Sequence, residues 1–366
     1  MDSLDAAIRA AQNEDLVLIP VEPNSRTLRG ELLMRIFLTG GTGMIGHRLV
    51  SRLKDRSDDV VIVSRSADET RRKPEFRGVQ VVPGDPTKPG PWQDEVNGTD
   101  AVVNLAGHNV FADRWSGEVR AKIRDSRVYG TENLVEAVRK APIKPTVFVQ
   151  GSAIGYYGHP EGDAELTEAG PSGADFLAVV CRELEQAAAP IMAMGLRLAT
   201  IRTGVVLGRG QGALGAMVPV FKWGGASPVG SGKSWFLPGR GNQWLSWIHL
   251  DDIVGLFLMA IDNPDAAGPI NGTAPRPARN VDFSRALAKA LHRPFLPVGP
   301  PDVLLSILLG GVSEAVTKGQ RVIPARASEL GYRFEHPDLL EAIRSALNAP
   351  DPTAGRAAPE PTVATG

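Results

Sequence analysis

The sequence predicts an α/β protein built on a doubly wound parallel sheet, with a smaller α+β lobe after it. Three observations support this fold class. Short runs that are apolar throughout alternate with helical stretches, a glycine-rich turn directly follows the first strand-like run, and this rhythm changes after about residue 208. Strands that are apolar on both faces are typical of a parallel sheet covered by helices on each side.

Six runs are rich enough in β-branched and apolar residues to be read as buried strands. They are "RIFLT" (35–39), "VVIVS" (60–64), "VQVV" (79–82), "AVVNLA" (101–106), "TVFVQG" (146–151) and "LATIRTGVV" (198–206). Between them, Glu118–Lys140 places apolar side chains near one face of a helix. Later helices are expected around Asp251–Ile261 and Asp282–Leu291.

We predict four regions along the chain. Residues 1–33 form a flexible leader, and residues 34–208 form a Rossmann domain that binds a dinucleotide, to which parts of 244–275 return. Residues 209–348 form a substrate lobe and a helical C-terminal part. Residues 349–366 are rich in Pro, Ala, Gly and Thr with few large apolar residues, which predicts a disordered tail.

Composition excludes several classes of function. Hydrophobic residues make up 43% and charged residues 22% of the 366 residues, and the net charge of -1 gives no field that would hold a nucleic acid. The single cysteine, Cys181, can form no intrachain disulfide and no zinc cluster. No run is long and apolar enough to span a bilayer. We therefore expect a cytoplasmic protein with a small-molecule substrate and no nucleic-acid or membrane partner; the sequence does not indicate its oligomeric state.

The stretch "MRIFLTGGTGMIGHRLVSRL" (34–53) indicates a dinucleotide-binding turn. Its glycines fit G-x-G-x-x-G from Gly41, or T-G-x-x-G-x-x-G from Gly40, and both patterns include Gly43 and Gly46. Glycine allows the tight turn and a close approach to a pyrophosphate, and the helix that follows offers free N–H groups. The alternative is a glycine turn needed only for packing.

The end of the second strand indicates which dinucleotide binds. An acidic residue there would favour NAD, but the sequence has Ser64 and Arg65. A guanidinium suits a 2′-phosphate. We therefore predict NADP(H) as the cofactor, the alternative being that Arg65 is an ordinary surface arginine.

Several motifs in order resemble the extended or atypical short-chain dehydrogenase/reductase superfamily. They are "TGGTGMIG", "NLAG" (104–107), "GSAIGYYG" (151–158), "RTGVVLG" (202–208) and "WIHLDD" (247–252). Together with "RW…K…SR" (114–127), "PVGSG" and the late "GQRVIPARASELGYRFEHPDL" (319–339), they are similar to a family of NAD(P)-dependent sugar-nucleotide epimerases with a small C-terminal domain. The match runs from about Met34 to Leu347.

The resemblance implies which residues contact the cofactor. The turn would hold the pyrophosphate, Ser64 and Arg65 the 2′-phosphate, the residues after the fourth strand the adenosine ribose, and Arg127 and Val206 the other half of the cofactor. Besides these four, the implied contacts are Gly40, Thr42, Gly43, Met44, Ile45, Gly46, Leu105, Ala106 and Gly107. Each could instead be an ordinary core or surface residue.

The chain departs from the superfamily at the catalytic dyad. Short-chain reductases use Tyr-x-x-x-Lys, but the residues four places after this chain's tyrosines are Asn133, Pro160, Glu161 and His336. Aligning Glu185 with the glutamate that commonly follows the lysine puts Cys181 at the lysine and Leu177 at the tyrosine. We expect Leu177 to be a core residue and Cys181 a small buried hydrophobe.

Three hydroxyls remain as catalytic candidates. Ser152 ends the fifth strand, where a carbonyl-binding hydroxyl is expected, although the spacing to the Tyr157–Gly158 pair would select Ala153. Tyr156 and Tyr157 could supply a replacement phenol, or one of them could serve packing alone.

Other signals are weaker. "GSGKS" (230–234) lacks the first glycine of a phosphate-binding loop, although Lys233 and Trp235 could line a substrate pocket. The six histidines show no metal-ligand spacing, so no metal is predicted. His249 is expected to begin a helix that Asp251 or Asp252 caps, and His108 is a candidate substrate contact.

Two functions fit these observations. The first is an NADP(H)-dependent oxidoreductase or epimerase that acts on a small polar or sugar-nucleotide-like molecule through a non-standard proton donor. The second is an NADP(H)-binding sensor with little or no catalysis, which the missing dyad favours.

Overall fold

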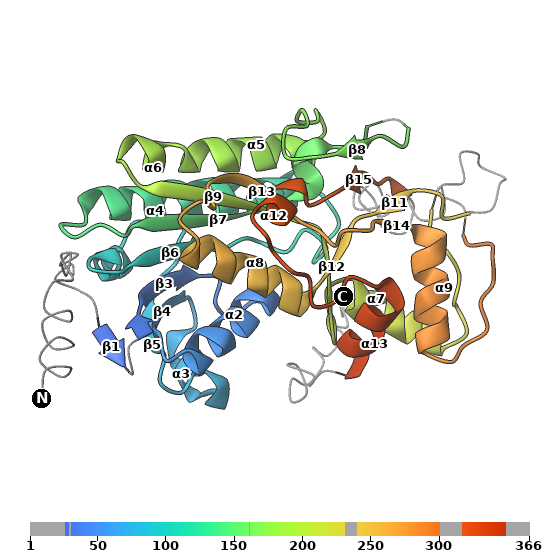
Figure 1. Ribbon diagram of the computed structural model, residues 1–366, viewed down its shortest axis with the longest axis horizontal. Coiled ribbons are helices and arrows are strands. Elements are labelled where there is room, and N and C mark those ends of the chain that lie inside the picture. Colours follow the sequence, from blue (N-terminus) through green and yellow to red (C-terminus); the bar gives the residue numbers. More distant parts are fainter. Residues whose placement is uncertain (1–25, 29–30, 161, 231–239, 301–316, 349–366) are drawn as a thin grey trace, which may run out of the picture.

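A seven-stranded parallel sheet forms the centre of the molecule (Figure 1). The computed structural model describes residues 26–28, 31–160, 162–230, 240–300 and 317–348. The sheet has the order β13-β9-β7-β6-β3-β4-β5, and all six of its neighbour pairs are parallel. Its strands are β3 (Arg35–Thr39), β4 (Asp59–Ser64), β5 (Gln80–Pro83), β6 (Ala101–Asn104), β7 (Val147–Ala153), β9 (Arg197–Thr203) and β13 (Gly268–Gly272). The predicted doubly wound α/β fold is confirmed.

Helices cover both faces of the sheet, as the apolar strands require (Figure 1). On one face lie α4 (Gly117–Lys140), α5 (Phe176–Ala188) and α6 (Pro190–Ala193), and on the other α2 (Met44–Asp55), α3 (Ala67–Arg72) and α8 (Leu250–Asp262). Short 3-10 turns η1 (Pro74–Phe76), η2 (Pro91–Val96) and η3 (Ile154–Tyr157) connect these elements. Two buried apolar clusters follow from this arrangement, one on each side of the sheet.

The sixth predicted strand is two strands in the structure. The run 198–206 divides at Gly204: β9 stays in the large sheet, whereas β10 (Val205–Gly208) pairs in parallel with β12 (Trp247–His249). The seventh sheet strand, β13, has the composition "GPING", which does not look like a buried strand in the sequence. It nevertheless lies beside β9 at the edge of the sheet.

A smaller lobe lies beside the carboxyl ends of the strands (Figure 1). Its helices α7 (Gly212–Lys222), α9 (Asn280–Ala290) and α13 (Leu339–Asn348) share one buried apolar cluster. Outside the central sheet and these helices lie helix α12 (Ala325–Glu329) and two short strand pairs. The pairs are β11 (Trp244–Leu245) with β14 (Ala278–Arg279), and β8 (Glu165–Leu166) with β15 (Arg321–Val322).

Parts of the predicted leader and of one predicted loop are outside the described residues. Within 1–33, β1 (Arg26–Leu28) and β2 (Glu31–Leu33) pair in antiparallel fashion. The earlier residues of the leader, the tail 349–366, and Lys233 and Trp235 of the "GSGKS" segment are not among the residues described. The domain boundaries proposed from the sequence stay predictions.

Candidate functional site: the crevice at the carboxyl ends of the strands

The glycine turn between β3 and α2 is closed by a backbone hydrogen bond, in which the Gly43 N–H donates to the Gly40 oxygen at 3.0 Å. Gly40 has φ +72, and a Cβ there would lie 2.5 Å from the carbonyl carbon of Leu105. A Cβ on Gly46 would lie 2.2 Å from the Gly40 oxygen. The turn therefore depends on glycine at both positions.

Helix α2 begins at Met44 with Gly43 as its N-cap, and no side chain caps it. The first N–H groups of a helix have no partner within the helix, and they carry a positive partial charge. Thr42 and Gly43 are exposed at the tip of the turn, whereas Met44 and Ile45 are half-buried. An exposed turn that leads into a helix without a side-chain cap is the arrangement that a pyrophosphate site requires.

Ser64 and Arg65 lie at the carboxyl end of β4 and differ in their surroundings. Ser64 is buried, and its hydroxyl lies 3.0 Å from the Thr70 hydroxyl and accepts a hydrogen bond from the Ser66 N–H at 3.2 Å. Arg65 is exposed. The Ser64 hydroxyl is thus engaged in the local turn, while the Arg65 guanidinium is accessible to a ligand.

Leu105, Ala106 and Gly107 follow β6, and the main chain of Leu105 and Ala106 lies directly against Gly40 of the glycine turn. The Leu105 and Ala106 N–H groups donate to the Thr39 carbonyl and hydroxyl oxygens, at 3.2 and 3.3 Å. Val206 on β10 is buried, and its side chain belongs to the apolar cluster beneath α2 and α8. The contacts implied for the two ends of the cofactor therefore come from different sheets, from the loop after β6 and from β10.

Arg127 on α4 reaches over this loop. Its Nη1 donates to the His108 and Ile123 carbonyl oxygens at 2.9 and 3.0 Å, and its guanidinium lies about 3 Å from the position of a Cβ on Gly107. Burial lowers the pKa of Arg127. Among the described residues no carboxylate pairs with it, so this cation is available to an anionic or hydroxyl-rich ligand.

The three candidate catalytic hydroxyls are brought together at the end of β7 and in η3. The Ser152 hydroxyl donates to the Glu185 carboxylate at 2.8 Å. The Tyr157 hydroxyl donates to Asn271 Oδ1 at 2.7 Å and accepts from Arg202 Nη1 at 3.0 Å. Tyr157 is 3% exposed, and burial raises the pKa of its phenol.

Tyr156 has a different environment. The Arg202 guanidinium lies over its ring, with the carbon Cζ 3.5 Å from the ring centroid. The residue is half-buried, and its hydroxyl donates no hydrogen bond to another described residue. Of the three candidates, Tyr156 is therefore the one whose hydroxyl is not committed to a protein acceptor.

Sequence reasoning did not identify Arg202 as part of this site. It is 4% exposed on β9 and forms a two-pronged ion pair with Glu185, through contacts of 3.0 and 2.8 Å. Burial opposes its charge, but the hydrogen bond and the charge of Glu185 dominate and raise the pKa of Arg202. An arginine inside a predicted buried strand was the one available signal, because such a charge requires a partner.

The positions that align with the missing dyad hold no proton-transfer group. Leu177 is half-buried rather than fully buried as expected, and Cys181 is buried. Burial raises the pKa of the Cys181 thiol to about 11, so the thiol stays protonated and unreactive.

Comparison with known proteins shows which family the chain belongs to. A model of the NAD dependent epimerase/dehydratase family matches residues 36–271. The chain belongs to this family. A second model, a domain of unknown function (DUF1731), matches residues 300–346.

Sequence relatives match most of the length of the chain. The chain is 40% identical over 323 residues to "Epimerase family protein SDR39U1 homolog, chloroplastic" of Arabidopsis thaliana, covering 87% of this chain and 88% of that protein. It is 35% identical to the epimerase family protein YfhF of Bacillus subtilis, over 85% of this chain and 97% of that protein.

Solved structures of other proteins share the fold of this chain. The human epimerase family protein SDR39U1, solved with NADPH, is similar with a TM-score of 0.71 and 31% identity, over 86% of this chain and 99% of that chain. A UDP-glucose 4-epimerase of Thermus thermophilus with NAD shares the fold at 20% identity and a TM-score of 0.66, over 86% of this chain and 98% of that chain.

The family's "WIHLDD" and "GYRFEHPDL" motifs meet at the start of α8. The cap of α8 is His249 itself, whose Nδ1 accepts the Asp251 N–H at 3.1 Å, so the expectation that an aspartate caps this helix is wrong. Asp252 instead accepts the backbone N–H groups of Glu335 and His336, at 2.7 and 3.0 Å. The family's C-terminal part is thereby attached to the sheet domain.

His249, Asp251 and His336 lie close enough to suggest a metal, although the sequence shows no such spacing. Their ligand atoms are within 4.8 Å of one another. However, His249 Nδ1 is occupied by the cap, and Arg48 Nε donates to Asp251 at 2.7 Å. Two of the candidate ligand groups are thus already held by other parts of the protein, so we assign no metal to this cluster.

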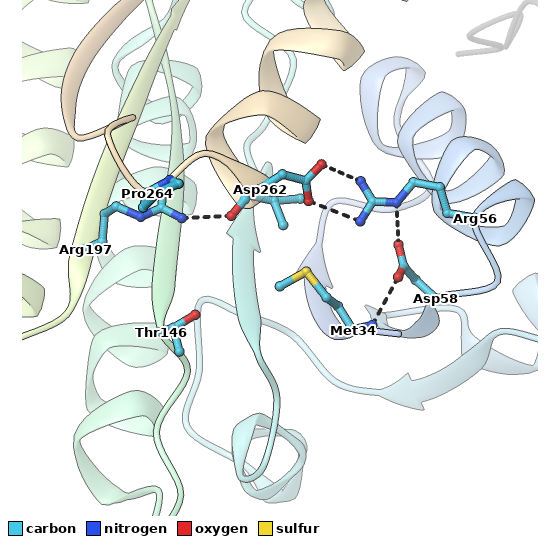
Figure 2. A pocket seen from close by; sticks show the side chains of 8 residues that line it. Met34, Arg56, Asp58, Thr146, Arg197, Asp262 and Pro264 are labelled. Atoms are coloured by element: carbon cyan, nitrogen blue, oxygen red, sulfur yellow. Dashed lines mark hydrogen bonds and ion pairs between the residues drawn. The ribbon is translucent and has the colours of Figure 1, made fainter. Parts of the chain in front are cut away.

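A hollow of about 590 Å³ lies at the opposite, amino end of the strands (Figure 2). Figure 2 shows Arg56 between Asp262 and Asp58, with the Asp58 carboxylate accepting the Met34 N–H, while Arg197 bonds to carbonyl oxygens at the end of α8. Arg56 thus pairs with the two aspartates and Arg197 bonds to main-chain oxygens, so each of these charged side chains already has a partner in the protein. We place the functional site at the carboxyl ends instead.

Within the described residues, no helix combines the length and the apolarity that crossing a membrane requires.

Proposed function

We propose that this chain is an NADP(H)-dependent oxidoreductase or epimerase that acts on a small polar substrate of the sugar-nucleotide kind. The observation that carries the proposal is that the glycine turn, Arg127 and the three hydroxyls lie at the same carboxyl edge of the parallel strands, where Arg127 has no carboxylate partner among the described residues. Family membership and the NADPH in the human SDR39U1 structure support it.

The residues present fit NADPH. The turn Gly40–Gly46 and the first N–H groups of α2 suit the pyrophosphate, and the exposed Arg65 suits the 2′-phosphate. We assign the 2′-phosphate contact mainly to Arg65, because the Ser64 hydroxyl already bonds within the protein. Arg127 and Val206 would lie beside the nicotinamide half.

We assign the role of proton donor to Tyr156. In the reductive direction NADPH, when bound, supplies a hydride to a carbonyl carbon. The Tyr156 hydroxyl would then give its proton to the carbonyl oxygen, so that the products are an alcohol and NADP⁺. The resulting phenolate would face the Arg202 guanidinium, and because Tyr156 is half-buried it could regain its proton from solvent.

Ser152 and Tyr157 take supporting roles in this proposal. The Ser152 proton points to the Glu185 carboxylate, which leaves the oxygen's lone pairs to accept a hydrogen bond from a substrate hydroxyl. Tyr157 holds Arg202 and Asn271 together behind Tyr156. Neither residue has a proton free to give to the substrate.

The NADP(H) sensor stays as a second candidate, because Leu177 and Cys181 occupy the positions that align with the dyad. It predicts tight cofactor binding with no turnover. Steady-state assays with a panel of carbonyl compounds and sugar nucleotides separate the two functions.

The test of the first function is the Tyr156→Phe variant. We expect turnover to fall by about 100-fold or more, since a general acid contributes about 10²–10⁴-fold. NADPH affinity should change little. Oxidation of NADPH is followed by its near-ultraviolet absorbance, with Tyr129→Phe as the matched control because Tyr129 is exposed on α4.

Unchanged turnover in Tyr156→Phe would remove Tyr156 as the donor. If the wild-type protein binds NADPH but turns over no compound in the panel, the sensor function is favoured instead.

A further inference from the structure

The first residues of the described C-terminal part cross the carboxyl ends of the sheet strands. We call residues 319–323 the crossing segment. Within it β15 pairs in parallel with β8, through Arg321 with Glu165 and Val322 with Leu166, and the Ile323 N–H donates to the Leu166 oxygen at 3.0 Å. The segment belongs to the part of the chain matched by the domain of unknown function.

Side-chain hydrogen bonds attach the crossing segment to the main sheet and to η3. Gln320 Nε2 donates to the Ile154 carbonyl oxygen at 2.9 Å, across 166 positions of sequence. Ser246 donates to the Gln320 oxygen at 2.8 Å and accepts the Val322 N–H at 2.9 Å. Asn271 Nδ2 donates to the Ile323 oxygen at 2.9 Å, while its Oδ1 holds the Tyr157 hydroxyl.

Apolar packing joins the same two segments. Val322 is fully buried in a small cluster with Ile154 and Tyr157, and Tyr156 and Leu166 pack against this cluster. The cluster is separate from the three larger ones, so Val322 is one of few apolar groups that hold η3 in place. Its removal would leave a cavity directly behind the two tyrosines.

The path of the crossing segment permits little movement. A Cβ on Gly319 would lie 1.8 Å from the Trp244 oxygen, so the main chain runs in direct contact with β11. Further along, the Arg326 N–H donates to the Glu168 carboxylate at 3.1 Å, and the same carboxylate oxygen accepts the Asn271 N–H at 2.8 Å. The segment is therefore held at both ends.

We propose that the crossing segment positions the turn Ile154–Tyr157, and that this is a function of the C-terminal domain in this chain. Gln320 and Val322 act as positioning residues through Ile154 and the two tyrosines. The consequence for catalysis rests on the proposed function of Tyr156, but the positioning itself is measurable without any substrate.

The experiment compares amide hydrogen exchange in full-length variants. Gln320→Glu replaces the donor to the Ile154 oxygen with an acceptor of the same shape, and Val322→Ala removes the packing group. For each variant we expect exchange of the peptide covering 154–158 to rise by about tenfold or more, because a local opening becomes easier. NADPH affinity should stay within about threefold of the wild type, because the glycine turn makes no contact with the segment.

Arg344→Ala is the control, since Arg344 is exposed on α13 of the same C-terminal part. It should leave exchange at 154–158 unchanged. Wild-type protection at 154–158 in both Gln320→Glu and Val322→Ala would overturn the proposal. So would loss of NADPH binding together with faster exchange across the whole sheet, because that result indicates a general role in folding rather than positioning.

The proposal can also stand without Tyr156. Faster exchange at 154–158, combined with unchanged turnover in Tyr156→Phe, would support the positioning role and reject Tyr156 as the proton donor.

Discussion

The glycine-turn half of the crevice and the η3 half are built on different principles. The turn offers main-chain N–H groups, and its shape follows from glycines within seven consecutive residues. The η3 half depends on side chains whose partners are 33, 114 and 166 positions away in the sequence. The turn that suits the cofactor is thus encoded locally, whereas the chemistry proposed for the other end depends on tertiary packing.

This difference explains how a member of the family can lack the Tyr-x-x-x-Lys dyad and keep its cofactor crevice. Leu177 and Cys181 lie on α5, whereas the turn is formed by main-chain groups between β3 and α2. The proposed proton donor on η3 would therefore require no change in the residues around the pyrophosphate.

The largest expected effect tests the glycine-turn half. Gly46→Ala places a Cβ 2.2 Å from the Gly40 oxygen. The turn must therefore distort, and its N–H groups no longer point to the pyrophosphate. We expect NADPH affinity to fall by about 100-fold or more, which is at least about 2.7 kcal/mol. Isothermal titration calorimetry measures this directly.

Gly117→Ala is the matched control for that variant. Gly117 is exposed at the start of α4, and a Cβ there meets nothing within 4 Å. An affinity within threefold of the wild type for Gly46→Ala would mean that the turn does not hold the cofactor.

The second effect concerns the attachment of the C-terminal part to the sheet domain. Burial, and the neighbouring His336, lower the pKa of His249 from 6.5 to about 4, with Asp251 opposing and Arg48 adding to the shift. Below pH 6.5 the unfolded chain binds a proton that the folded chain does not bind until about pH 4. The contribution of the neutral His249 to the free energy of unfolding is therefore present above pH 6.5 and is lost as the pH falls toward about 4.

Between about pH 7.5 and about pH 5 this loss should be roughly 2 kcal/mol, at about 1.36 kcal/mol per pKa unit. Denaturant unfolding at the two pH values measures it. In His249→Asn, which keeps an oxygen to cap α8, the difference in the free energy of unfolding between the two pH values should shrink by most of that amount. A pH dependence that is the same in both proteins would contradict the account.

The sequence predicted the elements whose signals are local. The strands β3 to β7, helix α4 and the glycine turn follow from apolar runs and glycine spacing. The sequence did not reveal the division of β9 from β10, nor β13, whose residues "GPING" resemble a turn. That strand forms because the neighbouring β9 and the helix α8 beneath the sheet supply its pairing and its cover.

For the candidate site, the sequence identified the three hydroxyls but could not rank them. Ranking required knowing that Ser152 bonds to Glu185 and that Tyr157 bonds to Asn271 and Arg202. None of these partners is near in sequence. The sequence also did not reveal the His249 cap. Only the folded backbone shows that the Asp251 N–H points to the His249 imidazole.

The third and smallest effect tests the central claim most directly: that this crevice holds NADP(H) and selects it through Arg65. The measurement is a calorimetric titration of the wild-type protein and of Arg65→Ala with NADPH and with NADH. Arg72→Ala is the control for the lost charge, because Arg72 is also exposed and lies on α3. We predict that the wild type binds NADPH more tightly than NADH, and that Arg65→Ala loses about tenfold, or about 1.4 kcal/mol, for NADPH alone. Equal affinities for the two cofactors, or no heat with either one, would contradict the account.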